Sequence, residues 1–453
     1  MAAGMTEAGA ALDLPPRRRE SAVTRWLRTA PPTVFALYGG LSAFLTYFAM
    51  YAYRKPFSAA SYAHVAGWPF AIDFKIMLVI AQVAGYALSK IIGIKVVSEM
   101  PRAYRALAIL VLIGLAEIAL TVFAVAPAIV GVAALFLNGL ALGMIWGLVV
   151  GFIEGRRLSE VLGAMLCASF ILSSGAVKSA GEALLVGGWA SERWMPAATG
   201  LLFAPLLLVS VWALAQLPPP NAQDEIERTP RTPMDRAMRR RFFRRHAAGL
   251  IALIGVYVML TALRDFRDNF AADIWNELGY SGEAGIFTWS ELPVAAISLV
   301  ALGMLIRVKD NRRGVIWNLI LVAIGLAVLG LATLGFQLGW LGPVSWMIAV
   351  GAGLYLAYTP FNALLFDRMI AATGSPGNAG FLIYVADACG YVGSVALLLV
   401  RNFAHVSLRW APFLCDVAYV TCVLGLIGTG YGLNRLMRTL TAEPLDTPMP
   451  RSL

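Results

Sequence analysis

The feature that most constrains this chain is a series of about a dozen apolar stretches, each close to twenty residues long. An α-helix needs about 20 apolar residues to cross the hydrocarbon core of a bilayer. Hydrophobic residues make up 59% of the 453 residues and charged residues only 14%, which is more apolar surface than a soluble domain needs. The stretches are continuous and do not alternate, which excludes the strands of a membrane barrel. The sequence therefore predicts an all-α, polytopic membrane protein with twelve transmembrane helices.

The twelve predicted helices form two groups of six, separated by a polar segment. Pro218–Pro220 would stop a helix, and the basic run Arg239–Arg245 cannot enter lipid. We therefore predict two six-helix bundles of nearly equal length. We expect a cytoplasmic N-terminal tail over residues 1–32 and a first bundle over residues 33–217. A basic cytoplasmic linker should follow over residues 218–246, then a second bundle over residues 247–436 and a cytoplasmic C-terminal tail over residues 437–453.

The distribution of charge predicts the orientation. The net charge of +10 would suit a nucleic-acid-binding protein, but the lysines and arginines flank the predicted helices and form no single basic face. They concentrate in both tails, in the linker and in the loops after the second, fourth and eighth helices. By the positive-inside rule, both termini are cytoplasmic. We expect a multi-pass protein of a bacterial inner membrane that binds no nucleic acid.

Residues typical of catalysis or metal binding are scarce. The four cysteines lie in apolar stretches, and the three histidines are scattered without the spacing of metal ligands. The sequence contains neither a phosphate-cradling loop nor a nucleophile elbow. We therefore expect no catalytic residues, no metal, no cofactor and no enzymatic activity, and an ATP-driven pump is disfavoured.

Two arginines lie at membrane depth. Arg54 follows the apolar run Val34–Tyr53, and Arg264 follows the apolar run Gly249–Leu263, 210 positions later. Each falls in the outer part of the first helix of its bundle. An arginine in the membrane interior costs at least about 2.5–3.5 kcal/mol, so each should face protein or water for a reason. Equivalent positions in two repeats suggest a shared anion site, because the planar fork of a guanidinium binds two oxygens of a phosphate or carboxylate.

Three segments carry a resemblance to a known family. The segment Tyr51–Ala60 reads YAYRKPFSAA, Leu263-Arg264 lies in the seventh helix, and the glycine-rich segment Gly139–Gly147 lies in the fourth. Together with the order of six helices, a linker and six helices, they resemble the organophosphate:phosphate antiporters of the major facilitator superfamily, the family of the glycerol-3-phosphate and hexose-phosphate transporters. The resemblance implies the major facilitator fold.

This resemblance implies a secondary transporter that moves a small organic anion, phosphorylated or carboxylated, by alternating access. Its partners would be the lipid bilayer and a small-molecule substrate, and we expect a monomeric antiporter. The two arginines would bind the anion, and with an empty site they would repel each other and favour opening. The residues expected to form the binding site are Arg54, Arg264, Tyr51, Tyr53, Tyr358 and Lys178.

Structural roles remain open for several of these charges. Arg54 could reach outward to the lipid head groups. Arg264 could pair with Asp268, four residues later on the same helix face. Lys178 could pair in the same way with Glu182, which also lies four residues later. Each of these three roles would explain the charged residue without a substrate.

The cytoplasmic segments after the second and eighth helices occupy the place of the superfamily's gate motif. In the loop Gly85–Lys90, Ser89 stands where the motif has an acid, whereas Lys309–Arg313 retains more of the motif. The residues predicted to form gating ion pairs are Asp268, Asp310 and Arg312.

Two carboxylates leave another mechanism open. Asp387 in the eleventh helix and Glu291 in the eighth lie on helices beside the expected cavity. A buried carboxyl group can carry a proton, so both are candidates for proton coupling in a symporter or exporter of a zwitterion, a sugar or a drug-like molecule. A third alternative is a membrane sensor or scaffold without transport, whose basic linker contacts anionic lipid or a soluble partner.

Overall fold

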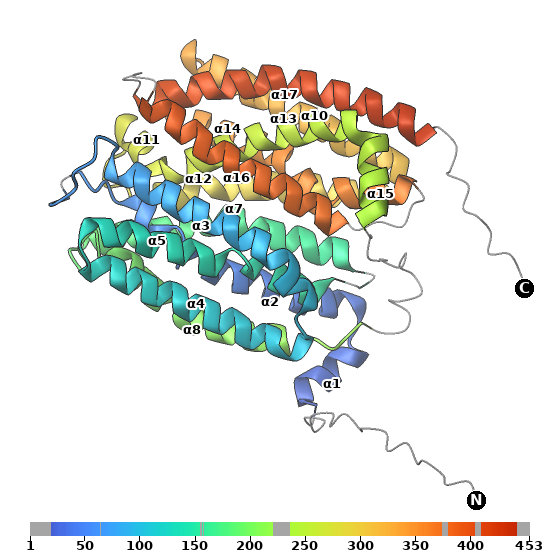
Figure 1. The fold of residues 1–453 in the computed structure, drawn as a ribbon, viewed down its shortest axis with the longest axis horizontal. Helices are drawn as coiled ribbons and strands as arrows, with labels where there is room; N and C mark the ends of the chain where they lie inside the picture. Colours follow the sequence, from blue (N-terminus) through green and yellow to red (C-terminus); the bar gives the residue numbers. More distant parts are fainter. Residues whose placement is uncertain are drawn as a thin grey trace, which may run out of the picture.

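The computed structural model describes residues 20–63, 65–154, 156, 158–220, 236–373, 379–403 and 409–441. In these residues the regular structure is entirely helical. The described residues contain twelve helical spans that are long and apolar enough to cross a membrane. The predicted all-α fold with twelve membrane-spanning helices is therefore confirmed. Figure 1 shows most of the long helices side by side with their axes roughly parallel.

The spans follow one another along the chain as predicted. The first six are formed by α2 (Pro32–Tyr51), α3 (Phe74–Glu99), α4 (Arg102–Val125), α5 (Ala128–Leu142) with α6 (Ile145–Ile153), α7 (Ser159–Val186) and α8 (Met195–Ala215). The second six are formed by α10 (Arg236–Asn269), α12 (Ile286–Ile306), α13 (Asn311–Gln337), α14 (Pro343–Ala363), α16 (Ala379–Phe403) and α17 (Trp410–Thr441). We call these the first and the second group of helices.

The two groups meet mainly along two pairs of helices. Helix α7 packs against α12, and α3 packs against α16. In Figure 1 the first group, blue to green, lies below the second, yellow to red. Gly175 of α7 permits the first contact, because a Cβ atom there would lie 2.3 Å from the carbonyl oxygen of Phe287 in α12. The side chains of the candidate site lie at this boundary.

The glycine-rich fourth span owes its composition to close packing. A Cβ atom on Gly139 of α5 would lie 2.1 Å from the carbonyl oxygen of Gln82 in α3, and one on Gly85 of α3 would lie 2.0 Å from the carbonyl oxygen of Phe136. Membrane helices approach closely where small residues face each other. The segment that resembles a family motif is therefore required for packing, and it also divides the span into α5 and α6.

Several predicted boundaries differ from the structure. Helix α10 begins at Arg236, so the basic run Arg239–Arg245 is helical and not part of an extended linker, in keeping with the high helix propensity of arginine. The predicted gate loop Gly85–Lys90 is a helical part of α3. The predicted N-terminal tail contains the helix α1 (Ala22–Thr29), which Ser21 caps. Residues 1–19, 221–235 and 442–453 of the predicted tails and linker lie outside the described residues.

The two ends of the molecule carry different short helices. Helices α1 and α15 (Leu365–Thr373) lie at the same end as the C-terminal end of α17, and α11 (Ala271–Glu277) lies at the opposite end (Figure 1). We call the end with α11 the outer end, following the orientation predicted from the charges.

Candidate functional site

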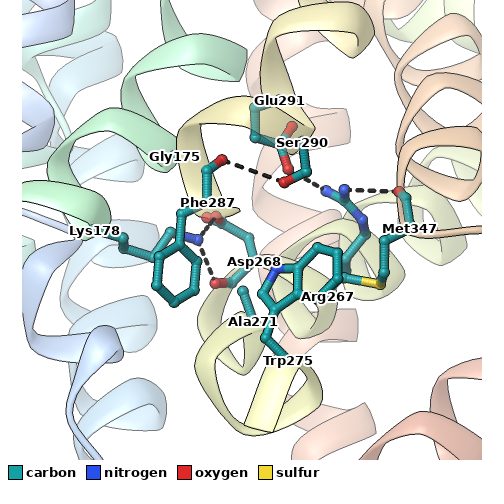
Figure 2. A pocket seen from close by; sticks show the side chains of 10 residues that line it. All are labelled: Gly175, Lys178, Arg267, Asp268, Ala271, Trp275, Phe287, Ser290, Glu291 and Met347. Carbon is teal, nitrogen blue, oxygen red and sulfur yellow. Dashed lines mark hydrogen bonds and ion pairs between the residues drawn. The ribbon is translucent and has the colours of Figure 1, made fainter. Parts of the chain in front are cut away.

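Two small neighbouring cavities lie between the two groups of helices. Each has a volume of about 10 Å³, close to the least space that one water molecule needs, and Asp268 lines both. The arginine cavity is lined by Tyr51, Arg54, Lys55, Arg264, Asp265 and Asp268, among others. The tryptophan cavity, drawn in Figure 2, is lined by Lys178, Arg267, Asp268, Trp275, Phe287 and Glu291, among others.

The end of the first span places Arg54 at the arginine cavity. Helix α2 is followed by a turn and the short helix η1 (Pro56–Ala59), because proline has no N–H group to continue the hydrogen bonds of a helix. The carbonyl oxygen of Tyr53 accepts a hydrogen bond from Asn138 Nδ2 at 3.0 Å, and that of Arg54 accepts one from Gln82 Nε2 at 2.9 Å. Buried side-chain amides thus satisfy the broken helix end, as a membrane interior requires.

The guanidinium group of Arg54 is buried without an acidic partner. The residue is 5% exposed, and its Cζ atom lies 3.9 Å from the ring centre of Tyr86. Its Nε atom has no hydrogen-bond partner, and no carboxylate among the described residues lies within ion-pair distance of it. Arg54 is therefore a buried cation with unused hydrogen-bonding capacity at the wall of a cavity.

Arg264 lines the same cavity but has a carboxylate partner. Its Nη2 atom donates to Asp265 Oδ1 at 2.8 Å, and its Cζ atom lies 4.3 Å from the ring centre of Tyr358. The structure thus brings Arg54 and Arg264, one from each group of helices, to one cavity. The alternative pair of Arg264 with Asp268 is wrong, because Asp268 is held by lysines of the first group.

Asp268 connects the two groups of helices. Its carboxylate lies 2.5 Å from Lys55 Nζ and 2.6 Å from Lys178 Nζ, and Ser174 donates a hydrogen bond to it. Figure 2 shows the Lys178 ammonium group directed at this carboxylate. The alternative pair of Lys178 with Glu182 in the same helix is wrong, because Lys178 reaches across to α10. Lys178 lines the tryptophan cavity, and Lys55 lines the arginine cavity.

The two cavities carry an excess of positive charge. Their walls contain five cationic side chains and three carboxylates, so two positive charges are not balanced. The cationic residues are Arg54, Lys55, Lys178, Arg264 and Arg267, and the acidic residues are Asp265, Asp268 and Glu291. Buried charges are costly unless they are paired, and more so at membrane depth. The arrangement can therefore bind an anion electrostatically and through hydrogen bonds.

The tryptophan cavity contains a second ion pair. Arg267 Nη1 donates to Glu291 Oε1 at 2.8 Å, and Arg267 Nη2 donates to the carbonyl oxygen of Met347 at 3.0 Å (Figure 2). Glu291 was predicted as a candidate for proton coupling. The structure places it beside a guanidinium group, and its protonation would weaken that charge-assisted hydrogen bond.

Asp387, the other predicted candidate for proton coupling, does not line either cavity. Its carboxylate lies 3.1 Å from Lys90 Nζ in α3 and accepts a hydrogen bond from Tyr257. The Tyr257 hydroxyl lies 2.9 Å from that of Tyr358, whose ring stacks on Arg264. Asp387 is therefore linked to the arginine cavity through two tyrosines.

The three predicted tyrosines differ in position. Tyr51 lines the arginine cavity, and Tyr358 stacks on Arg264. Tyr53 does not line either cavity, because its ring lies against α8, where a Cβ atom on Gly200 would be 3.0 Å from its Cδ1 atom. Residues three apart in a helical turn share a face, so Tyr51 faces the same way as Arg54 whereas Tyr53 does not. Tyr53 is therefore separated from Tyr51 and Arg54 in this arrangement of the helices.

The predicted gating residues Asp310 and Arg312 form no ion pair among the described residues. Asp310 Oδ1 accepts a hydrogen bond from the backbone N–H of Arg313 at 2.6 Å and caps α13, while Arg312 is exposed. The third predicted gating residue, Asp268, does form ion pairs between the groups. Near α15, Arg368 pairs instead with Glu160 of α7 at 3.2 Å.

Ion pairs join the two groups on both sides of the cavities. Toward the outer end, Lys75 of α3 lies 2.7 Å from Asp273 of α11. Toward the other end, Lys90 pairs with Asp387, and Arg368 forms the pair described above. Both of these lysine pairs, like the two that Asp268 forms, take the cation from the first group and the carboxylate from the second. Lysine is a flexible point charge, so such pairs can separate when the groups move.

Several cavity-lining residues were not predicted as site residues. They are Lys55, Phe170, Asp265, Arg267 and Tyr355. Helical spacing was the available signal. Arg267 follows Arg264 by three positions, and Tyr355 precedes Tyr358 by three, so each shares a helix face with a predicted residue.

Transporters of known structure share this fold. A D-xylose–proton symporter is 14% identical with a TM-score of 0.57, over 88% of this chain and 97% of that chain. A bacterial homologue of the human lysosomal transporter Spinster is 14% identical with a TM-score of 0.57, over 93% and 100%. A bacterial homologue of the human drug peptide transporters PepT1 and PepT2 is 13% identical with a TM-score of 0.59, over 90% and 100%. The fold is therefore that of the major facilitator superfamily.

The chain belongs to a family described as one of unknown function (DUF5690), whose model matches residues 56–435. No curated protein matches the sequence significantly. The matched segment contains Arg264 and begins directly after Arg54 and Lys55.

Proposed function

We propose that the protein is a secondary transporter that moves a small organic anion, phosphorylated or carboxylated, across a bacterial inner membrane by alternating access. The fold supports this proposal, because the solved structures that share it are described as transporters or as homologues of transporters. The position of the cavities supports it as well, since transporter sites of this kind lie between the two repeats.

The observation that carries the proposal is the state of Arg54. The guanidinium group is buried, its Nε atom has no hydrogen-bond partner, and no carboxylate of the described chain pairs with it. A structural role would predict an acidic partner, as Arg264 has in Asp265. The nearby ring of Tyr86 favours the cation but leaves its hydrogen-bonding capacity unused. An anion that enters the arginine cavity would supply the missing partner.

The charge of the two cavities narrows the class of anion. Two positive charges remain after the three carboxylates are counted against the five cations. A phosphate monoester or a dicarboxylate would balance this excess, whereas a monocarboxylate would balance half of it. A zwitterion would balance none of it. We therefore favour a divalent organic anion.

The ion pairs support a cycle in which the groups of helices separate. Each cavity accommodates no more than about one water molecule, so a substrate enters only after the groups part. An anion beside Arg54 would compete with Asp268 for the ammonium group of Lys55. We infer exchange of anions as the mode of transport, because Asp387 and Glu291 are each already paired with a cation and would have to leave it to carry a proton.

The decisive test is anion binding by the Arg54→Gln variant. We expect propyl phosphate or succinate, but not acetate at the same concentration, to raise the melting temperature of the purified protein. The variant should bind the same anion at least about 30-fold more weakly, because it loses a buried charge-assisted contact. Arg312→Gln, an exposed arginine outside the cavities, is the matched control. Unchanged affinity in Arg54→Gln, or binding of acetate alone, would overturn the proposal.

The same anion in proteoliposomes tests the mode of transport. Exchange predicts that uptake of the labelled anion accelerates when unlabelled anion is trapped inside, and that a protonophore leaves the rate unchanged. A rate that collapses with the protonophore would favour the proton-coupled alternative. Binding without any flux would favour a sensor.

A further inference from the structure

We infer that the tryptophan cavity is a second subsite, which recognises a hydroxyl group on the transported anion away from its charged head. This inference rests on the proposed function, because it assigns one part of the same substrate to the arginine cavity. It adds that the substrate is a hydroxylated organic anion and that Arg267 and Glu291 select it.

The evidence is a pair of unused polar atoms on one ion pair. Arg267 and Glu291 bind each other through Nη1 and Oε1, and Arg267 Nη2 is occupied by the carbonyl oxygen of Met347. The remaining atoms, Arg267 Nε and Glu291 Oε2, are both buried and lack a hydrogen-bond partner. Buried polar atoms are nearly always paired, so one donor and one acceptor here call for a partner.

The chemistry of these two atoms selects a hydroxyl group. A hydroxyl can accept a hydrogen bond from Arg267 Nε and donate one to Glu291 Oε2. An ammonium group can only donate, and it would face the charges of Arg267 and Lys178. A carboxylate can only accept, and it would face Glu291. The volume of this cavity suits a single water molecule, and a ligand hydroxyl that forms the same hydrogen bonds can replace such a water.

The position of Asp268 allows one ligand to reach both cavities. Its carboxylate lines the two of them and is held between Lys55 and Lys178. When the charged head of a ligand takes Lys55, the carboxylate loses one of its two cations and the barrier between the cavities is weakened. The rings of Trp275 and Phe287 offer apolar walls to the carbon chain beyond it (Figure 2).

The test compares ligands that differ by one hydroxyl group. We would measure the affinities of the wild-type protein for inorganic phosphate, propyl phosphate and 3-hydroxypropyl phosphate, or for succinate and 2-hydroxysuccinate if only dicarboxylates bind. We expect the hydroxylated ligand to bind at least about tenfold more tightly than its deoxy counterpart, as for a hydrogen bond to a charged group. This preference should fall to less than about threefold in Glu291→Met, which lacks the carboxylate acceptor and keeps only the neutral contact of the hydroxyl with Arg267 Nε.

Two further variants keep the test decisive. Glu291→Gln should retain part of the preference, because it keeps the shape but loses the charge, and it serves if Glu291→Met does not fold. Glu182→Gln, on α7 but outside both cavities, should keep the full preference. Equal affinities in the wild-type protein would overturn the subsite and leave the proposed function intact. Failure of the proposed function has a different signature, namely that no anion binds in a manner dependent on Arg54.

Discussion

The two groups of helices contribute very different charges to the candidate site. The first group supplies only cations, Arg54, Lys55 and Lys178, whereas the second supplies all three carboxylates and two arginines. The first group therefore contributes three positive charges to the cavities, and the second group contributes a net charge of one negative unit. In this closed arrangement the groups attract each other. The repulsion expected between Arg54 and Arg264 is outweighed by the carboxylates of the second group.

This difference indicates which side needs a ligand. The second group balances its own arginines, since Arg264 pairs with Asp265 and Arg267 pairs with Glu291. The first group depends on a carboxylate from the other side, and Asp268 provides it for both lysines. Asp268 thus holds the place that an anionic substrate would take. Competition between the two anions links binding to separation of the groups.

The largest effect is expected for Asp268→Asn, which removes the carboxylate that Lys55 and Lys178 share. The free energy of unfolding should fall by about 3 kcal/mol, because two buried ammonium groups lose their counter-ion. The affinity for propyl phosphate should rise, because the ligand no longer competes with a carboxylate. Denaturation and binding in detergent measure both, with the exposed Asp416→Asn as control. Weaker anion binding by a stable variant would show that Asp268 does not compete with the ligand.

A smaller effect should separate the two arginines from each other. Arg264→Gln leaves Asp265 buried without its cation, so we expect a loss of about 2–3 kcal/mol in the free energy of unfolding. Arg54→Gln removes a cation that had no acidic partner, so the free energy of unfolding should change by less than about 0.5 kcal/mol. Thermal and chemical denaturation of both variants give the comparison. Equal destabilisation by the two substitutions would mean that Arg54 is a structural residue after all.

The sequence predicts the fold and the two arginines for physical reasons that act locally. A run of about 20 apolar residues predicts a membrane-spanning helix by its length and composition alone. A charge that follows an apolar run, repeated at the same place in both halves, marks Arg54 and Arg264. The ion pairs could not be predicted in this way, because the partners of Asp268 lie 213 and 90 positions away in Lys55 and Lys178. The rule that residues four apart on a helix can pair predicted Arg264 as the partner of Asp268, and it could not predict partners from other helices.

The direction of a side chain after a helix end is equally hidden from sequence. Tyr51 and Tyr53 both belong to a tyrosine-rich segment that resembles a family motif, but only Tyr51 lines the arginine cavity. The turn that follows α2 keeps Tyr51 and Arg54 on one face and sends the Tyr53 ring toward Gly200. The position of this turn depends on Asn138 and other residues of distant helices.

The smallest effect therefore tests these two tyrosines against each other. Tyr51→Phe removes a hydroxyl group from the wall of the arginine cavity, and it should weaken anion binding about three- to tenfold, the worth of one hydrogen bond. Tyr53→Phe should change the affinity less than about twofold, because its ring lies away from both cavities. Since the two substitutions are chemically identical and two positions apart, titration of both variants with the same anion isolates the direction of the side chain. A stronger effect at Tyr53 would mean that the segment turns in the opposite sense when the anion binds, and Arg54 would then leave the cavity with Tyr51.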